Sequence, residues 1–299
     1  MKQIISLTKR NVKLFFKDKS LFFVSLITPM ILLVLYVTFL GNVYKDSLLA
    51  NLNGLVLSDK VVGGFVGAQL CSSILSVSCV TVAFCSNMLM VQDKASGALA
   101  DLTVSPVKRE KLGIAYFLAT ELTTLIVAGF ALVASFVFLA IQGWFLSFTD
   151  VLLLILDVLL LTTFGTLLSS IVNSFLSTQG QISAVGTMVS SGYGFISGAY
   201  MPLSQFGEGL RKVLGFFPGT YGTSLLRNHA MRGVFSEMQE QGMPAQLVEE
   251  VKTAFDCNLY FFENKVELWV TFAVILGTVA VLFAVYLLIM KSQNAKRGK

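Results

Sequence analysis

The sequence has few charged residues. Asp, Glu, Lys and Arg make up 13% of its 299 residues, whereas hydrophobic residues make up 55%, and the mean hydropathy is +0.76. A water-soluble domain of this composition would expose far more apolar surface than its core could bury. The composition therefore excludes a soluble protein and predicts a single integral membrane domain over residues 1–299.

The sequence also lacks the residue patterns of most enzymes and metal proteins. It has one histidine, no G-x-x-x-x-G-K-[ST] phosphate-binding loop, no G-x-S-x-G motif and no cluster of metal ligands. These absences argue against an enzyme and predict neither a metal site nor a cofactor site in this chain. A transporter with this sequence must take its energy from a partner or from an ion gradient.

Cysteine is scarce as well. Cys71, Cys79 and Cys85 lie in one apolar segment, and Cys257 lies alone in a polar loop. No disulfide framework is predicted from this spacing.

What the sequence does have is a set of long apolar segments. Roughly 20 apolar residues cross the membrane as a helix, because a helix rises about 1.5 Å per residue and the hydrocarbon core is about 30 Å thick. A polar, turn-prone break at residues 173–180 divides the longest segment into two. The sequence therefore predicts an all-α polytopic membrane protein with six transmembrane helices, at residues 20–40, 62–91, 112–140, 150–172, 181–200 and 267–290.

Lys and Arg gather at the ends of these segments. They are concentrated in the first 19 residues, in the loop after the second span and in the C-terminal tail, which all fall on one side of a six-span protein. Short loops rich in Lys and Arg stay in the cytoplasm, so both termini are expected to be cytoplasmic in a multi-pass protein of the cell membrane. The net charge of +5 is then explained without a nucleic-acid partner.

Residues 1–19 predict an amphipathic helix on the cytoplasmic leaflet. One broad face is apolar, interrupted by Thr8 and Asn11, and the basic residues cluster on the opposite face. We expect an interfacial helix in contact with membrane lipid. The alternative is a basic flank of the first span that happens to be helical.

The cytoplasmic loop at residues 92–111 carries the most specific pattern. Leu99 and Leu102 lie on one side of a short amphipathic helix, which Ser105-Pro106 is expected to end because the residue before a proline avoids helical geometry. A solvated turn that merely joins two spans is the alternative.

This loop and two later segments resemble the permease subunits of ABC type 2 exporters. The loop reads as an acid-basic pair, Gly-small-Leu, an acid, Leu, and then Ser-Pro-Val with a basic residue. The later segments are S-G-A-Y-M-P-L-S-Q-F at 197–206 and F-P-G-T-Y at 217–221, followed by Leu226-Arg227. With the amphipathic N-terminus, the resemblance covers essentially the whole chain. Asp93-Lys94 stands where Glu-Arg is commoner, Ala98 where Thr is frequent and Phe206-Gly207 where proline is usual, which leaves the subfamily and the cargo open.

The resemblance implies a mechanical role. In that family the cytoplasmic loop is a coupling helix seated in a cleft of a separate ATPase subunit, which binds ATP and Mg²⁺, and the N-terminal helix packs beside it. Two permeases form the pathway, as a homodimer or as a heterodimer with a related chain. Carried over to this sequence, the residues that meet the ATPase would be Asp93, Lys94, Gly97, Leu99, Asp101 and Pro106.

Polar groups within the spans are candidates for the translocation path. Gln69 and Asn87 belong to a polar stripe on the second span, which suits a helix facing a partner or a cavity. Glu121 and Asp157 are the ionisable residues of the spans, where a charge is costly, and they enter from opposite sides, so no mutual pair is expected. No basic or histidine partner is expected within the spans, because His229 is predicted to lie in an external loop in a structural role. Each acid is either functional or a protonated packing residue.

The external region at residues 201–265 combines apolar and polar stretches. Residues 213–218 are too short to span and suit a segment that dips into the bilayer and returns. The resemblance places short re-entrant helices in this region, which makes Pro202, Pro218 and Tyr221 candidates for an external gate. Pro244 and the apolar spacing after it predict one amphipathic helix outside the membrane.

The sequence therefore predicts a permease half that dimerises and exports a drug-like, lipid-like or peptide cargo by coupling to an ATPase. The alternative is an ion-coupled secondary transporter or channel that uses Glu121 and Asp157. A non-transporting membrane enzyme or scaffold is a third interpretation, against which the lack of a nucleophile-base pair counts.

Overall fold

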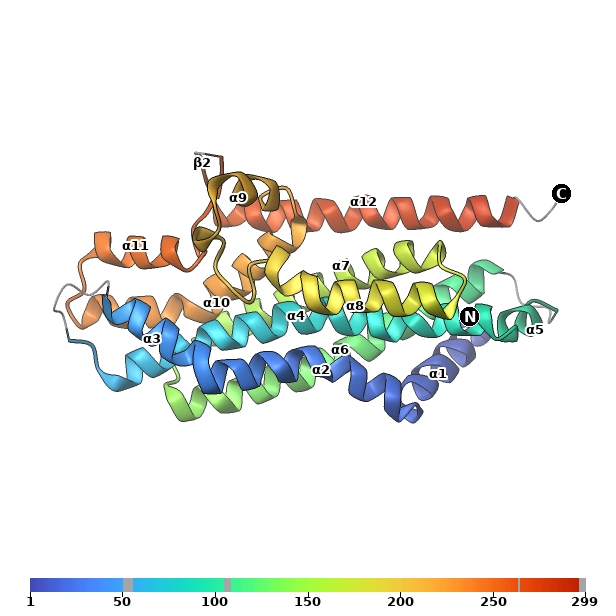
Figure 1. The fold of residues 1–299 in the computed structure, drawn as a ribbon, viewed down its shortest axis with the longest axis horizontal. Helices are drawn as coiled ribbons and strands as arrows, with labels where there is room; N and C mark the ends of the chain where they lie inside the picture. Colours follow the sequence, from blue (N-terminus) through green and yellow to red (C-terminus); the bar gives the residue numbers. More distant parts are fainter. Residues whose placement is uncertain (51–55, 105–108, 263, 296–299) are drawn as a thin grey trace.

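The computed structural model describes residues 1–50, 56–104, 109–262 and 264–295, which form an elongated helical bundle (Figure 1). Besides a π-helical segment (Tyr36–Leu40) and a 3₁₀ turn (Leu203–Gln205), its elements in chain order are α1 (Lys2–Lys17), α2 (Lys19–Leu35), α3 (Gly41–Ala50), α4 (Asp59–Ala95), α5 (Ala98–Val104), α6 (Arg109–Gln142), α7 (Phe148–Ser174), α8 (Gln179–Ile196), α9 (Glu208–Leu214), α10 (Pro218–Glu240), α11 (Ala245–Ala254), β1 (Leu259–Phe261), β2 (Asn264–Val266) and α12 (Leu268–Ala295).

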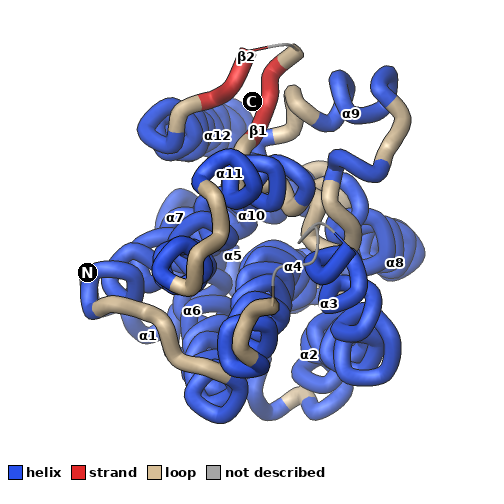
Figure 2. The backbone as a smooth tube through the Cα atoms, turned by 90° about the vertical axis from the view of Figure 1, so that its left-hand side faces the viewer, coloured by secondary structure: helices blue, strands red, loops and turns tan. Residues whose placement is uncertain are grey.

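α4 is the central helix of the bundle. Within its most apolar stretch 89% of the residues are buried, against 11% for α12. The end-on view shows α4 enclosed by neighbouring helices (Figure 2), with α2, α6, α7, α8 and α10 in contact with it. The polar stripe of the second span is thus covered by protein rather than by lipid, as the hydroxyl-rich sequence predicted.

Five helical segments of the described chain are long and apolar enough to cross a membrane: Lys19–Ala50, Asp59–Ala95, Glu110–Gln142, Phe148–Ser174 and Leu268–Ser292. They correspond to the first four predicted spans and the last one. The predicted fifth span forms α8, a helix of 18 residues that does not belong to this set. The predicted break is confirmed, because α7 ends at Ser174 and α8 begins at Gln179 with a capping box on Thr178.

Small residues on α4 and α7 bring the helices close together. A Cβ on Gly63 would lie 2.8 Å from the carbonyl oxygen of Gln142 on α6, and one on Gly165 of α7 would lie 2.7 Å from the carbonyl oxygen of Cys79 on α4. Both glycines are therefore used in packing within the subunit.

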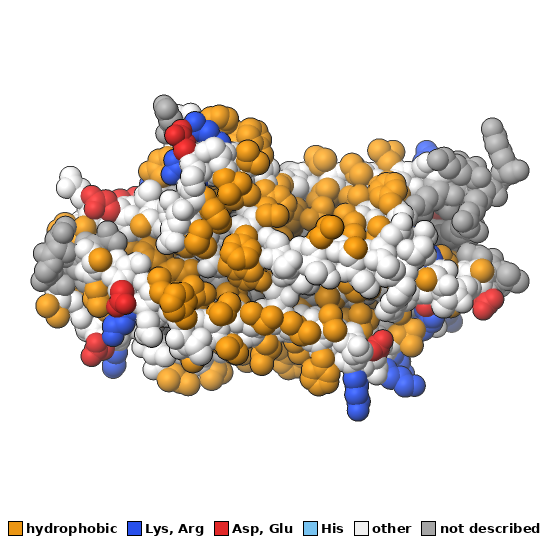
Figure 3. Space-filling model, viewed as in Figure 1, with side chains coloured by type: hydrophobic (Ala, Val, Ile, Leu, Met, Phe, Trp, Pro, Cys, Tyr) orange, Lys and Arg blue, Asp and Glu red, His pale blue; other side chains and the backbone are white. Residues whose placement is uncertain are grey.

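The surface separates into an apolar middle and charged ends. Hydrophobic side chains cover the central part of the face in Figure 3, and Lys, Arg, Asp and Glu lie toward the ends. α1, α5 and the last turns of α12 lie at the same end of the molecule (Figure 1), so the three basic segments share one side as predicted. This distribution fits a protein whose middle lies in hydrocarbon.

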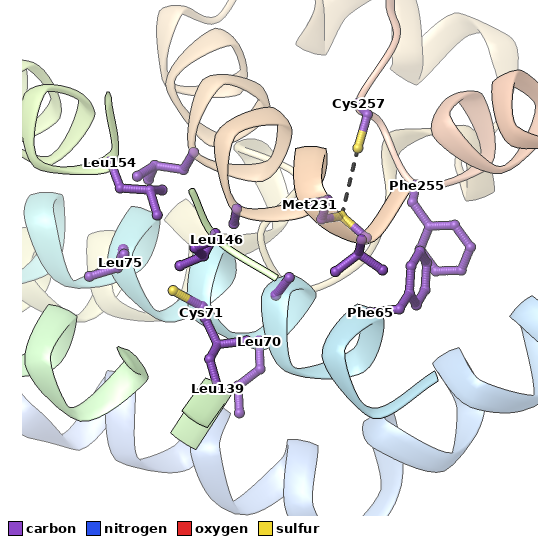
Figure 4. Close-up of a cluster of buried hydrophobic side chains, with 14 of the residues drawn as sticks. Phe65, Leu70, Cys71, Leu75, Leu139, Leu146, Leu154, Met231, Phe255 and Cys257 are labelled. Atoms are coloured by element: carbon purple, nitrogen blue, oxygen red, sulfur yellow. Dashed lines mark hydrogen bonds between the residues drawn. The ribbon is translucent and has the colours of Figure 1, made fainter. Parts of the chain in front are cut away.

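Residues 201–265, which were predicted to be external, form several helices and a short hairpin. The predicted dip at residues 213–218 is the turn between α9 and α10, and the amphipathic helix after Pro244 is confirmed as α11. The main element is α10, 23 residues long, which packs against α4, α7 and α12. Figure 4 shows the core that α4, α6, α7, α10 and the segment after α11 build together, in which the Sγ of Cys257 lies 3.7 Å from the Sδ of Met231.

Candidate functional site

The C-terminal end of α4 is tied to α1 and α6 by a buried carboxylate. Asp93 is 6% exposed and accepts hydrogen bonds from Nη1 of Arg10 (2.8 Å) and from the hydroxyl of Tyr116 (2.5 Å). The hydrogen bond between Arg10 and Asp93 raises the pKa of the Arg10 guanidinium above its ordinary value. The predicted interfacial helix is thus fixed to the bundle.

The residues that interrupt the apolar face of α1 are the ones that the bundle covers. Thr8 and Asn11 are buried together with Phe15, whereas Ile5 and Phe16 are exposed. The expected amphipathic helix is confirmed: the middle of its apolar face packs on protein, whereas Ile5 and Phe16, at the edge of that face, stay exposed. The buried Asn11 has a polar partner in this face, because its Oδ1 accepts a hydrogen bond from Arg10, which also binds Asp93.

Lys94 closes the end of the neighbouring span. Its Nζ donates to the carbonyl oxygens of Asn173 (3.1 Å), Ser174 (3.2 Å) and Leu176 (3.2 Å) at the end of α7. A cation at a helix C-terminus satisfies carbonyl groups that have no partner within the helix. Asp93 and Lys94 therefore point into the bundle from the last turns of α4, where they join α1, α6 and α7.

α5 follows a single glycine turn. Gly97 has a φ of +83°, and the amides of Ala100 and Asp101 donate back to its carbonyl oxygen at 2.8 and 3.3 Å. Leu99 and Leu102 are half-buried, whereas Ala100 and Asp101 are exposed, which confirms the predicted amphipathic helix. The predicted end of this helix at Ser105-Pro106 lies outside the described residues. The six predicted coupling residues are therefore divided. Asp93 and Lys94 brace the bundle, and Gly97, Leu99 and Asp101 form the turn and helix beyond it. Pro106 lies outside the described residues.

The translocation-path candidates on α4 are buried inside the subunit. Nδ2 of Asn87 donates to the hydroxyls of Ser169 (3.2 Å) and Ser170 (2.9 Å) on α7, and Gln69 has no exposed surface. Further hydroxyl pairs, Ser76 with Thr223 and Ser86 with Thr123, link α4 to α10 and α6. A polar seam thus runs along the central helix.

The two acids of the spans do not pair with each other, as predicted, and each has a partner of its own. Glu121 accepts a hydrogen bond from Thr163 at 2.9 Å across the α6–α7 contact. Asp157 is 3% exposed and its Oδ2 lies 2.5 Å from Nδ1 of His229. Two expectations are therefore wrong: His229 is a buried residue of α10 rather than a loop residue, and Asp157 does have a histidine partner. The apolar positions of α10 follow no clean helical stripe, so no sequence pattern indicated that this helix enters the bundle.

A comparison with curated proteins found no match to the chain. The family model for the ABC-2 type transporter matches residues 2–230. The chain belongs to the ABC-2 type transporter family. It is therefore a permease component of an ABC transporter and a multi-pass membrane protein. The family is a membrane transport component and is not itself catalytic.

The gate candidates of the permease lie around the start of α10. Pro218 occupies the first helical position, where its missing N–H costs nothing, and the hydroxyl of Tyr221 donates to the carbonyl oxygen of Gly215 (2.7 Å). Pro202 precedes the 3₁₀ turn. Pro218 and Tyr221 thus shape the turn between α9 and α10, whereas Pro202 lies at a separate turn before α9.

Arg227 and Asp256 form a buried ion pair that no pattern in the sequence indicated. Arg227 is 1% exposed and bonds the carbonyl oxygens of Phe255 (3.0 Å) and Gly198 (2.9 Å), with Asp256 at 3.4 Å. Asp256 also accepts from the backbone amide of Leu203 at 2.5 Å. Burial raises the pKa of the Asp256 carboxyl, and Arg227 opposes that rise. The motif residues of 197–206 are thus held against α10 and the end of α11.

Proposed function

We propose that this permease is the membrane subunit of an ATP-driven exporter in the cell membrane, with both termini in the cytoplasm. α5 carries this proposal: a short amphipathic helix held beyond the end of the central helix, with Asp101 exposed. A separate ATPase subunit, which binds ATP and Mg²⁺, docks on α5. The cargo is drug-like, lipid-like or a peptide.

The braces around α5 support a mechanical role. A force on α5 reaches α4 through the two-residue turn Ser96-Gly97, and Asp93 and Lys94 pass it to α1, α6 and α7 through hydrogen bonds. Gln69 and Asn87 lie within the same central helix, so a tilt of α4 against α7 would change the polar seam that they form. Rigid elements with charge-assisted contacts suit such a transfer, because packed helices move as units.

The exposed face of α8 supports a dimeric pathway of two six-span subunits. Ser183, Thr187 and Ser191 are exposed, and each bonds only the carbonyl oxygen four residues earlier in the described structure. A hydroxylated face at membrane depth suits a second subunit or an aqueous path better than lipid. With α8 as a sixth span, α1 and the end of α12 fall on one side, where Figure 1 places them.

The coupling role is tested by Gly97→Ala and Asp101→Asn in a reconstituted complex with its ATPase. Alanine at 97 must adopt a positive φ, which costs about 1 kcal/mol or more, and we expect a severalfold loss of export per ATP hydrolysed. Gly277→Ala is the matched control, because a Cβ at either glycine contacts nothing and only Gly97 has the positive φ. Asp59→Asn, at the other end of α4, is the control for Asp101. Unchanged export in both test variants, with normal membrane insertion, would contradict the coupling role.

Ion-coupled transport is the second candidate, and the Asp157–His229 pair favours it. A carboxyl and an imidazole in contact inside the bundle can exchange a proton between two packed helices. Transport in vesicles separates the candidates. Removing ATP or adding vanadate stops the proposed exporter, whereas collapse of the proton gradient stops an ion-coupled transporter, and Asp157→Asn and His229→Gln would then abolish its pH dependence.

A further inference from the structure

An apolar cavity of about 650 Å³ lies on the side of the bundle between α2, α4 and α6. Apart from Ser78 and Ser135, its lining side chains are aliphatic, aromatic or sulfur-containing. Its volume lies in the range of ordinary ligand sites. None of the coupling or translocation-path candidates contributes to it.

The cavity follows from the sequence of α2 and α6. Pro29 interrupts the hydrogen-bond ladder of α2, and α6 presents Ala131, Ala134 and Ser135 toward it, so small side chains face the proline. Phe130 and Met30 form the open rim and are 72% and 55% exposed. The cavity therefore opens on the part of the bundle surface that is expected to face lipid.

The length of the cavity matches one leaflet. Its lining runs from Phe22 to Leu33 on α2 and from Val127 to Phe138 on α6, which is 12 residues, or 11 helical rises, on each helix. At about 1.5 Å per residue this is about 16 Å, roughly half of the 30 Å hydrocarbon core. The cavity therefore suits one extended acyl chain of a lipid in a single leaflet.

One end of the cavity is positively charged. Phe16, from the last turn of α1, lines it, and the next residues of the chain include Lys17 and Lys19, both exposed. The carboxylate between them, Asp18, is occupied as the cap of α2, where it accepts from the amide of Leu21 (3.1 Å). Figure 3 shows Lys and Arg side chains projecting at the end of the molecule where α1 and α2 meet.

We propose that this cavity binds one anionic phospholipid, with an acyl chain between α2 and α6 and the phosphate headgroup on Lys17 and Lys19. Lysines near a bilayer surface attract anionic lipid, and the apolar groove removes acyl CH₂ groups from competition with other lipids. The bound lipid fills the space between α1, α2 and α6. The lipid would thus restrict the movement of α1, which Arg10 ties to the C-terminal end of α4. The proposal depends on membrane insertion and not on the driving force or the cargo of transport.

Photo-cross-linking tests the proposal on the full-length protein. The chain is placed in phosphatidylcholine nanodiscs that contain either phosphatidylglycerol or phosphatidylcholine with a diazirine on the acyl chain, and labelled peptides are mapped by mass spectrometry. We expect labelling to concentrate on α2 and α6, with phosphatidylglycerol favoured roughly tenfold over phosphatidylcholine. Lys17→Gln with Lys19→Gln should reduce that preference to about one, and Lys45→Gln is the control at the opposite end of the first span.

Filling the cavity separates bound lipid from bulk lipid. Ala134→Trp, at an exposed lining position, should reduce labelling of α2 and α6 at least severalfold, and Ala134→Leu serves where the larger side chain prevents folding. Leu288→Trp on the exposed face of α12 is the control and should change nothing. Equal labelling of α2, α6 and α12, no preference for phosphatidylglycerol, unchanged labelling in the folded Ala134 variants, or cross-links to a second copy at this face would each overturn the proposal.

Discussion

At the scale of single residues, one buried ion pair connects residues 197–206 with α10 and the end of α11. Arg227 and Asp256 are 1% and 6% exposed, and between them they bond the backbone of Gly198, Leu203 and Phe255. A buried pair contributes little net energy when intact, but removing one partner leaves an uncompensated charge. The pair therefore acts as a structural connection between the 197–206 motif and α10.

Arg227→Leu should destabilise the protein by about 3–5 kcal/mol, because it leaves the Asp256 carboxylate buried without its cation. Thermal unfolding of the purified protein in detergent measures the change. Lys212→Leu breaks the exposed pair with Glu208 and should be indistinguishable from the unchanged protein. Similar unfolding of the two variants would show that Arg227 has no special role.

At the scale of elements, α1 is held by a charge-assisted contact rather than by lipid alone. Arg10→Gln should weaken the bond to Asp93 by about 1.5–3 kcal/mol, which raises hydrogen exchange of α1 by roughly ten- to a hundredfold. Lys9→Gln, on the exposed side of the same helix, is the control. Equal exchange in both variants would mean that the apolar contacts of α1 suffice.

α11 and the β1–β2 hairpin are joined through Glu249. Its carboxylate accepts from Lys252 (2.7 Å), Lys265 (3.0 Å) and Asn258 (3.0 Å), which lowers the pKa of Glu249 to about 2 from 4.5. Because the folded pKa lies below the unfolded one, this stabilisation is complete above pH 4.5 and is lost as the pH falls toward 2.

Hydrogen exchange of α11, corrected for the intrinsic rate, should therefore rise as the pH falls through this range. Glu249→Gln should remove most of that pH dependence, and Glu250→Gln, its exposed neighbour without these bonds in the described structure, should retain it. An unchanged pH profile in Glu249→Gln would show that other groups govern the hairpin.

At the scale of the whole molecule, the proposed dimer predicts where two copies meet. Cysteine placed at Thr187 on the hydroxylated face of α8 should form a disulfide between subunits under mild oxidation, because this face suits a partner better than lipid. The four native cysteines are buried and leave the readout clear. Leu288→Cys, on the exposed apolar face of α12, is the control. Equal cross-linking at both positions would contradict the α8 interface.

The sequence by itself determined the membrane class, most of the spans, the break after α7 and the amphipathic character of α5 and α11. These features depend on composition and local periodicity, which a single segment carries. The sequence also located the motif residues of the loop at 92–111. It did not show that Asp93 and Lys94 contact the bundle whereas α5 lies beyond it.

Only the tertiary structure decided which polar residues meet. Asp157 and His229 are separated by 72 positions, and Asp93 and Arg10 by 83, so no local pattern connects them. α10 has no apolar stripe of its own, and α4 and α7 provide partners for its buried Thr223 and His229. Such pairs depend on how helices pack, because a buried polar group is stable only where another element brings its partner.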